Sequence, residues 1–306
     1  MEAQENDDEI FVYMGGDQRV PDGVRRARIH KSVKIIRKLA FYHRWYLISV
    51  ELHDGIEIIE ENAFYGCRWL RGGIKLLGVK IIKECAFYNC TALTDVEFGD
   101  KLETIETASF YSCRKLRNII MPSVGTIGVR AFAECKQLAE LDLPEDLETL
   151  EYKAFYGCQH VERIIMPLKD DMVAVNVFNG CSNLTSLSLG GGTHNTVASL
   201  HLETWRSEMK DEINRINHVL PNTEAKTTEI RRWMRSVNRR FNHYKTEHAL
   251  LLKEAKTLLE LAVWKAKIDQ NEERLKPDTQ SERRTQRITS GASTIIKNVL
   301  PFLELK

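Results

Sequence analysis

A phenylalanine recurs at almost constant spacing through the first two-thirds of the chain. The seven positions are Phe41, Phe64, Phe87, Phe110, Phe132, Phe155 and Phe178. Successive intervals are 23 residues, apart from one of 22 residues between Phe110 and Phe132. A fixed period of this size is typical of a solenoid, in which each repeat is one structural unit packed against its neighbours. The spacing therefore predicts a binding scaffold, but it indicates no reaction.

Each repeat also carries apolar residues at fixed distances before its phenylalanine. In the repeat that ends at Phe110 they are Leu93, Val96, Phe98, Leu102 and Ile105. Val96 and Phe98 alternate with polar neighbours, as in a half-buried strand. One such strand per repeat, stacked in register, gives a parallel sheet whose neighbours lie about 4.8 Å apart. We therefore expect a ladder of eight parallel strands.

The repeat before Phe87 departs from this pattern. Its inward positions would fall on Gly73 and Lys75, whereas Ile74 and Leu76 are the better core residues. A shift of one residue moves side chains to the other face of a sheet. We therefore expect a one-residue slip or a bulge in this repeat.

A second departure precedes Phe178. The stretch 168–172 places Lys169, Asp170 and Asp171 where an apolar residue is due. We expect the chain to loop out of the solenoid at this point.

Six of the phenylalanines are followed three residues later by a cysteine. These are Cys67, Cys90, Cys113, Cys135, Cys158 and Cys181, and Cys85 lies outside the series. We expect buried free thiols that act as small hydrophobic groups. Parallel Cβ vectors on adjacent turns would strain a disulfide, and no CxxC pair or histidine at ligand spacing supports zinc. We predict neither a metal site nor a cofactor.

Length, charge and hydropathy narrow the class of protein. A chain of 306 residues suggests about two domains, and a net charge of +1 gives no general attraction to nucleic acid or membrane. No run approaches the roughly 18 apolar residues of a membrane span. The segment 1–10 is acidic and lacks the apolar core of a signal peptide. We expect a cytoplasmic protein, with the nucleus as an alternative.

Changes in pattern divide the chain into five parts. We predict an N-terminal tail and cap at 1–20, the solenoid at 21–190 and a glycine-rich linker at 191–197. A helical hairpin with coiled-coil-like character follows at 198–276. Residues 277–306 form a mobile polar segment and an apolar tail, which is expected to dock on the helices or to engage a partner.

Beyond the linker the hydrophobic period changes from two to about 3.5. The first helix is predicted from near Ala198 to Val219. Pro221 ends it, and either Asn222 or Thr223 serves as the N-cap of the second helix. We expect the second helix to reach about residue 275.

An apolar stripe in alternating steps of four and three residues runs along the second helix. Its members are Ile230, Met234, Val237, Phe241, Tyr244, His248, Leu251, Ala255, Leu258 and Ala262. Such a heptad seam predicts coiled-coil-like packing and makes homo-oligomerisation through the seam a hypothesis. Trp233, Leu252 and Leu259 widen the stripe, which favours a bundle over a two-stranded zipper.

The repeat resembles a known family. The pattern AF-Y-x-C-x-x-L-x-x-Ø-x-Ø-P, seen at 154–158 and across 138–144, resembles the BspA-type leucine-rich repeat over residues 20–190. Members of that family are mostly surface or interaction proteins without a catalytic centre, and the resemblance implies the same here. The helical blocks 205–216 and 258–267 look like those of multi-copy, diatom-like algal leucine-rich-repeat families. The expected fold class is α+β, with a leucine-rich-repeat solenoid carrying a parallel strand ladder, followed by a long helical hairpin or coiled-coil-like region.

Outward-facing strand positions line the exposed face of the predicted sheet. We predict that a protein or peptide binds there, because an open sheet is a common contact surface of solenoids. The predicted contact residues are Glu51, Asp95, Glu97, Ile120, Glu140, Asp142 and Ile165. The five carboxylates suggest a discontinuous acidic stripe that suits a basic peptide, with the isoleucines as apolar spots. An ordinary solvated face is the alternative.

Three arginines of the second helix form a separate candidate site. Arg231, Arg235 and Arg239 share a face at i, i+4 spacing and could contact phosphates. A charged helix surface, docked on an acidic patch of the solenoid, is the alternative that we favour, because no base-reading motif lies beside them.

No pattern in the sequence indicates catalysis. The run 190–192 lacks the Lys and Ser/Thr of a phosphate loop, and no nucleophile stands beside a paired base. We therefore predict a non-enzymatic protein–protein interaction scaffold. Its sheet face binds a protein or peptide, and its helical region oligomerises or docks a second partner. The secondary hypothesis is nucleic-acid association through the basic helix at 226–247.

Overall fold

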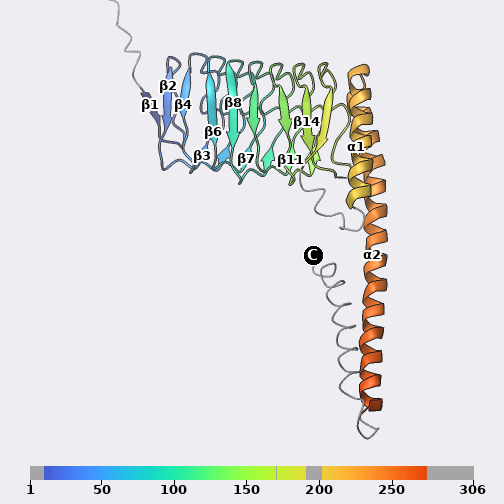
Figure 1. Cartoon of the computed structure of the whole chain (residues 1–306). Coiled ribbons are helices and arrows are strands. Elements are labelled where there is room, and N and C mark those ends of the chain that lie inside the picture. Colours follow the sequence, from blue (N-terminus) through green and yellow to red (C-terminus); the bar gives the residue numbers. More distant parts are fainter. Residues whose placement is uncertain (1–9, 170, 191–201, 274–306) are drawn as a thin grey trace, which may run out of the picture. The chain divides into compact units, whose positions relative to one another are not determined.

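The computed structural model describes residues 10–169, 171–190 and 202–273. The described chain forms a solenoid of short β-strands followed by two α-helices (Figure 1), which confirms the predicted fold class. The strands and Glu208–Asn238 belong to one compact unit. A second unit holds the start of the first helix and the second helix from Arg239 onward. The sequence-based boundaries had placed both helices together in one region after the solenoid.

One strand of each turn contributes to a parallel ladder, as predicted, and Ile10–Tyr13 in the predicted N-terminal tail adds a ninth strand to the eight expected. Its strands are β1 (Ile10–Tyr13), β2 (Arg26–Ile29), β4 (Ser49–Glu51), β6 (Gly72–Leu76), β8 (Leu93–Phe98), β10 (Asn118–Ile120), β12 (Glu140–Asp142), β14 (Arg163–Met166) and β15 (Ser186–Leu189). Figure 1 shows the strands of successive turns side by side. Hydrogen bonds group them as β1-β2-β4, β6-β8-β10 and β12-β14-β15, so the ladder has three segments.

A second ladder, which the sequence analysis did not predict, runs along another side of the turns. It consists of the two-residue strands β3 (Ile35–Ile36), β5 (Ile58–Ile59), β7 (Ile81–Ile82), β9 (Thr104–Ile105), β11 (Thr126–Ile127) and β13 (Thr149–Leu150). The second residue of each strand is fully buried. Two residues are too few to show an alternating pattern, so these positions were recognised only as part of the core.

Both predicted irregularities can be compared with the structure. The register between β6 and β8 shifts between Gly72 and Gly73, which confirms the slip and buries Ile74 and Leu76. Before Phe178 the expected loop includes Asp170, which lies outside the described residues, while Asp171 is exposed. Met172 and Val173 are buried, and Val173 forms a bridge to Leu150, so the chain follows the solenoid again by that point.

The recurring phenylalanines form a column of stacked rings, which we call the Phe column. All seven are fully buried. Neighbouring ring centroids lie 4.7–6.0 Å apart, and neighbouring ring planes differ by at most 12°. At the N-terminal end Tyr13 packs on Phe41 with a centroid distance of 5.3 Å. Tyr13 therefore covers the first ring of the column.

The backbone conformation around the phenylalanine is also repeated from turn to turn. Around Phe87, both Cys85 and Asn89 have a positive φ, of 55° and 59°. This alternation turns the N–H groups of all three residues toward the next turn, and the Phe87 N–H donates to the Ser109 carbonyl at 2.7 Å. Equivalent bonds join the other turns. The Phe column therefore carries a hydrogen-bond ladder whose donors all point toward the C-terminal end.

The six periodic cysteines form a second buried column, the Cys column. They are free thiols, as predicted. Each thiol also donates a weak hydrogen bond to the carbonyl of the phenylalanine 25 or 26 residues earlier, at 3.1–3.3 Å. Burial raises the pKa of Cys113 to about 12. The thiols therefore join the turns as well as filling the core.

Parts of two helices cap the last turn of the solenoid. They belong to α1 (Leu202–Val219) and α2 (Lys226–Glu273), which are joined through the 3-10 turn η2 (Leu220–Asn222). The Leu187 N–H donates to the Asn217 side-chain oxygen at 2.7 Å, and the Phe178 N–H donates to the Thr227 hydroxyl at 2.8 Å. Two ladder donors that would otherwise lack an acceptor are thereby satisfied.

The start of α2 lies later than predicted. The Ala225 carbonyl accepts the first helical bond, from the Glu229 N–H, so Ala225 is the N-cap in place of Asn222 or Thr223. Thr223 instead accepts a bond from the Ala225 N–H and closes the preceding turn. The η2 turn after α1 includes Asn222 and is followed directly by Thr223, so both suggested residues belong to this turn and its C-cap.

The predicted heptad seam is divided between different surroundings. Ile230, Met234 and Val237 are buried in the first unit. In the second unit, Phe241 packs against Trp205 with a centroid distance of 5.5 Å. Leu251 and Leu258, which were expected in the seam, are exposed. The predicted linker 191–197, the helix end near residue 275 and the tail 277–306 lie outside the described residues.

Candidate functional site

The outward side chains of β2, β4, β6, β8, β10, β12, β14 and β15 form one surface, here called the strand face. The strands place every predicted contact residue on it: Glu51 on β4, Asp95 and Glu97 on β8, Ile120 on β10, Glu140 and Asp142 on β12, and Ile165 on β14. The parallel register sets Ile120 opposite Glu97, and Ile165 opposite Asp142. Within each hydrogen-bonded segment the strands are therefore in register, but the composition of the face changes at each step.

Cross-strand ion pairs neutralise much of the predicted acidic stripe. Glu97 pairs with Lys75 at 2.9 Å, and Glu140 pairs with Arg163 at 3.4 Å. Glu51 accepts a bond from Arg28, which holds the pKa of the Glu51 carboxyl below its ordinary value. Sequence reasoning counted the acids without setting them against the basic residues of the neighbouring strands, and the slip in β6 also hid the outward position of Lys75. The strand face therefore carries mixed charge.

The two aspartates of the stripe differ from each other. Asp95 accepts bonds from the Thr94 hydroxyl and the Asn118 amide, each at 2.6 Å. The Thr94 bond, followed by the Asn118 bond, lowers the pKa of the Asp95 carboxyl. Asp142 is exposed and forms no ion pair within the described part of the chain. Asp142 is thus the carboxylate of the stripe best placed to meet a cation from a partner.

An aromatic cluster at the edge of the strand face was missed by sequence reasoning. Its two contacting rings are those of Tyr46, just before β4, and Trp69, just before β6. Trp45 is counted with them because it directly precedes Tyr46, although its own ring contacts His43. The exposed fractions of Trp45, Tyr46 and Trp69 are 52%, 51% and 52%. The Tyr46 and Trp69 rings meet edge to face at 5.3 Å, and the Trp45 indole donates to His43 at 2.7 Å. The available signal was two of the five tryptophans standing outside the apolar ladder.

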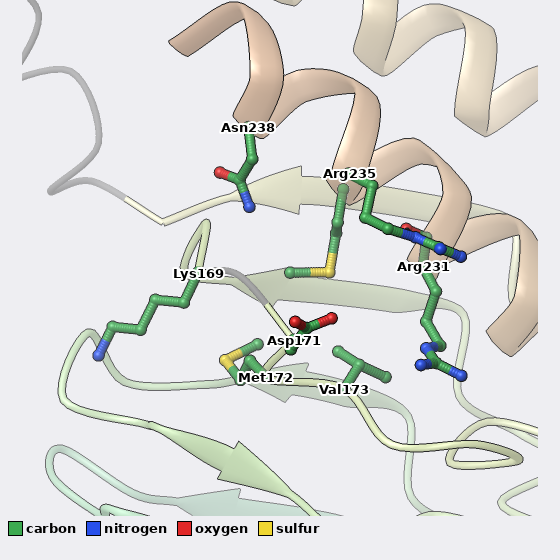
Figure 2. Close-up of a pocket in the computed structure, with 8 residues that line it drawn as sticks. Lys169, Asp171, Met172, Val173, Arg231, Arg235 and Asn238 are labelled. Carbon is green, nitrogen blue, oxygen red and sulfur yellow. The ribbon is translucent and has the colours of Figure 1, made fainter. Parts of the chain in front are cut away.

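The arginines of α2 have different surroundings. Arg231 and Arg235 line a small pocket with Lys169, Asp171 and Asn238, at the last turn of the solenoid (Figure 2). The Arg235 guanidinium donates to the Arg231 carbonyl at 3.3 Å. Arg239 is exposed and belongs to the second compact unit. The structure therefore brings two of the three arginines together beside an aspartate of the solenoid.

Residues 10–169, 171–190 and 202–273 contain no cluster of three or more His, Cys, Asp or Glu side chains that could hold a metal ion. Among the helices of these ranges, none is long and apolar enough to cross a membrane.

The repeating turns place one exposed strand face on one side of the solenoid and the buried Phe and Cys columns in its interior. This arrangement is typical of a leucine-rich-repeat solenoid. The family profile described as "BspA type Leucine rich repeat region (6 copies)" matches residues 24–124 and 109–203, which together span more than half of the chain. The protein therefore belongs to the BspA-type leucine-rich-repeat family. A comparison with curated protein sequences gives no match.

Solved structures of similar fold come from several bacteria. The leucine-rich repeat protein of T. pallidum is 23% identical, with 58% of this chain and 68% of that chain covered and a TM-score of 0.39. A leucine-rich cell surface protein of Faecalibacterium prausnitzii is 22% identical, with 55% and 61% covered and a TM-score of 0.39. A leucine-rich repeat protein from Bacteroides ovatus is 21% identical, with 58% and 60% covered and a TM-score of 0.37. This chain thus spans about three-fifths of the second and third proteins, and similarity at this level supports no inference about function.

Proposed function

We propose that the protein is a non-enzymatic scaffold whose strand face binds a protein or peptide. The observation that carries the proposal is the aromatic cluster of Trp45, Tyr46 and Trp69 at the edge of that face. Leucine-rich repeats of this family generally mediate protein–protein interaction. The cluster supplies a place where such an interaction would be anchored.

The composition of the surface supports a protein partner. Tryptophan and tyrosine are enriched at the energetic centres of protein interfaces, because they bury a large area at low cost in conformational entropy. Ile120, which is 57% exposed, adds an apolar contact further along the strand face. The mixed charges of the face favour a partner with both charge signs over a uniformly basic peptide.

The test is affinity capture from native lysate with the full-length chain and its Trp69→Ala variant. Val175→Ala is the control, because Val175 is 50% exposed in the same compact unit as Trp69 and lies on none of the proposed contact surfaces. A discrete protein partner should be lost with Trp69→Ala and kept with Val175→Ala. Capture that survives Trp69→Ala, Trp45→Ala and Tyr46→Ala together would rule out the cluster as the anchor.

The predicted carboxylates are tested separately. Asp142→Lys should weaken capture more than Glu140→Gln, because Glu140 is already paired with Arg163 whereas Asp142 has no ion pair within the described chain. Binding constants measured with the captured partner at two salt concentrations check this order. Equal losses for the two variants would contradict the proposed role of the ion pairs.

We also propose that α2 oligomerises or docks a second partner through its exposed apolar face. Leu250, Leu251, Leu258, Leu261 and Trp264 are exposed. They fall within an arc of about 140° at roughly 100° per residue. Sedimentation velocity should show a self-associating wild type and a monomeric Leu258→Glu/Leu261→Glu variant. A monomeric wild type that captures no second partner would refute this part.

Nucleic-acid association through Arg231, Arg235 and Arg239 stays the alternative hypothesis. The position of Arg231 and Arg235 beside Asp171 supports a structural role for these two residues. A nuclease-treated arm of the capture experiment distinguishes the hypotheses, because a partner held through nucleic acid is lost on digestion.

Two further proposals concern the cellular location of the protein and the group of leucine-rich-repeat families to which it belongs. We propose a cytoplasmic or nuclear location, and membership of the diatom-like algal families with a helical C-terminal region. The free cysteines support the location, because thiols stay reduced inside the cell. The helical blocks support the membership. Imaging of a tagged chain tests the location. Algal sequences that carry both the repeats and the helical blocks would support the membership.

A further inference from the structure

A pocket of about 650 Å³ lies where the solenoid ends against the turn between the helices. The last turns contribute Tyr156 and residues 179–182, and the helical turn contributes residues 221–224 and Lys226. All of them belong to the same compact unit. The volume is within the range of small-molecule sites. Glu224 and Lys226 are the only lining residues with ordinarily charged side chains.

Lys226 is an unusual residue for this position. It is only 4% exposed, and its ammonium donates to the Leu220 carbonyl at 2.7 Å. It forms no ion pair with a carboxylate of the described residues. Lys226 is also the first residue of α2, where the helix dipole disfavours a cation. Burial and the dipole therefore both oppose the charge, and an ammonium has three N–H donors, of which the Leu220 bond uses one.

A backbone donor in the same pocket also lacks its usual acceptor. In the six preceding turns, the N–H group two residues after the phenylalanine donates to a carbonyl of the next turn at 2.7–2.9 Å. Gly180 holds this place in the last turn, lines the pocket and donates to no group of the described chain. The pocket thus lies at the end of the hydrogen-bond ladder where the last N–H donor has no following turn to supply a carbonyl. An oxygen atom of a ligand would take the place of that carbonyl.

We propose that this pocket binds a small oxyanion, a carboxylate or phosphate group, between the Lys226 ammonium and the Gly180 N–H. The anion supplies the charge that the buried lysine lacks and the acceptor that the ladder lacks. The start of a long helix adds further N–H donors and a favourable dipole. Glu224 is exposed and would weakly repel an anion. The site is separate from the strand face, so its failure would leave the proposed scaffold function untouched.

The test titrates the full-length protein with inorganic phosphate and, separately, with acetate, at ionic strength held constant with sodium chloride. The melting temperature should rise by about 3–5 °C when the anion exceeds its Kd about tenfold. Lys226→Met, which preserves volume, should lose about tenfold or more in affinity measured by calorimetry. Glu224→Gln is the control and should bind at least as tightly as the wild type. The phosphate and acetate arms show which oxyanion the site prefers.

A second readout keeps the proposal testable if Lys226→Met does not fold. In the wild type, the amide resonance of Gly180 should shift on titration and saturate with the calorimetric Kd. Binding of neither anion, an equal melting shift in Lys226→Met, or an unchanged Gly180 resonance would each overturn the proposal. Weaker binding by Glu224→Gln would do the same, because it would make Glu224 the partner of Lys226.

Discussion

The Phe and Cys columns and the strand face are built by the same turns of the solenoid. Residue types are constant along the columns, whereas they change from turn to turn on the strand face. In the columns the same residue types return at each step, and the rings and thiols are fully buried. On the strand face the residue opposite Glu97 is a lysine on one side and an isoleucine on the other. A buried position must fit the same neighbour before and after it, whereas a solvated position has no such requirement. Repetition within the chain therefore marks stability, and variation marks the surface available for recognition.

The largest expected effect is in the middle of the Phe column. Phe110→Ala should lower the free energy of unfolding by about 3–5 kcal/mol, because it leaves a cavity between two stacked rings. Ile120→Ala on the strand face is the control and should cost less than about 0.5 kcal/mol. Urea denaturation measures both variants. Similar losses would abolish the distinction between column and face.

The cap at the end of the Phe column comes next. Thr227→Val should cost about 1–3 kcal/mol, because it leaves the Phe178 N–H without its hydroxyl acceptor. Thr228→Val is the matched control, since Thr228 is exposed on the same helical turn. Thermal unfolding compares the two variants. A control that loses as much as Thr227→Val would point to helix propensity as the cause.

The Cys column predicts a dependence on alkaline pH. The folded state raises the pKa of Cys113 from 9.0 to about 12, so the thiol stays protonated in the fold after it ionises in the unfolded chain. Its contribution to stability is therefore fully present below pH 9 and is lost between pH 9 and about 12. Each such thiol adds a slope of about 1.4 kcal/mol per pH unit in this window.

Cys113→Ala should make the decline in unfolding free energy shallower by that slope. Cys85→Ala is the control, because the pKa of the half-buried Cys85 is raised only to about 11 and its influence should end earlier. Urea denaturation at a series of pH values from 8 to 12 gives the slopes. An unchanged slope in Cys113→Ala would mean that the unfolded chain also protects this thiol.

The smallest effect is expected on the strand face. Glu140→Gln breaks the exposed pair with Arg163 and should change the free energy of unfolding by less than about 0.5 kcal/mol. Urea denaturation in low and high salt checks the value. A cost above 1 kcal/mol would show that the face contributes to stability and is not free to vary.

The sequence predicted those parts of the structure that repeat. The Phe and Cys columns, the strand ladder and the slip in β6 follow from positions that recur or visibly fail to recur, because each buried position must match its neighbours. The second ladder was missed because its strands are two residues long. The predicted N-cap was wrong because the extra η2 turn delays the start of α2.

The candidate site was predicted less completely. The outward positions on the strand face were located from alternation alone. Their ion pairs were not, because a list of outward residues does not say which side chains meet across neighbouring strands. For Lys75 and Glu97 the pairing also depends on the register on either side of the slip. The aromatic cluster of Trp45, Tyr46 and Trp69 has no period, so no pattern search would find it. The pocket at Lys226 depends on a contact between segments that are distant in the sequence.

The uniform bonding between turns has a consequence for how such a chain can change in length. Tyr13 closes one end of the Phe column and Thr227 closes the other, and neither is part of the repeat. Duplication of one 23-residue unit inside the solenoid would create no new kind of interface and would leave both ends intact. The size of the recognition surface can therefore change with the number of repeats, while the contacts that close the two ends of the solenoid stay the same.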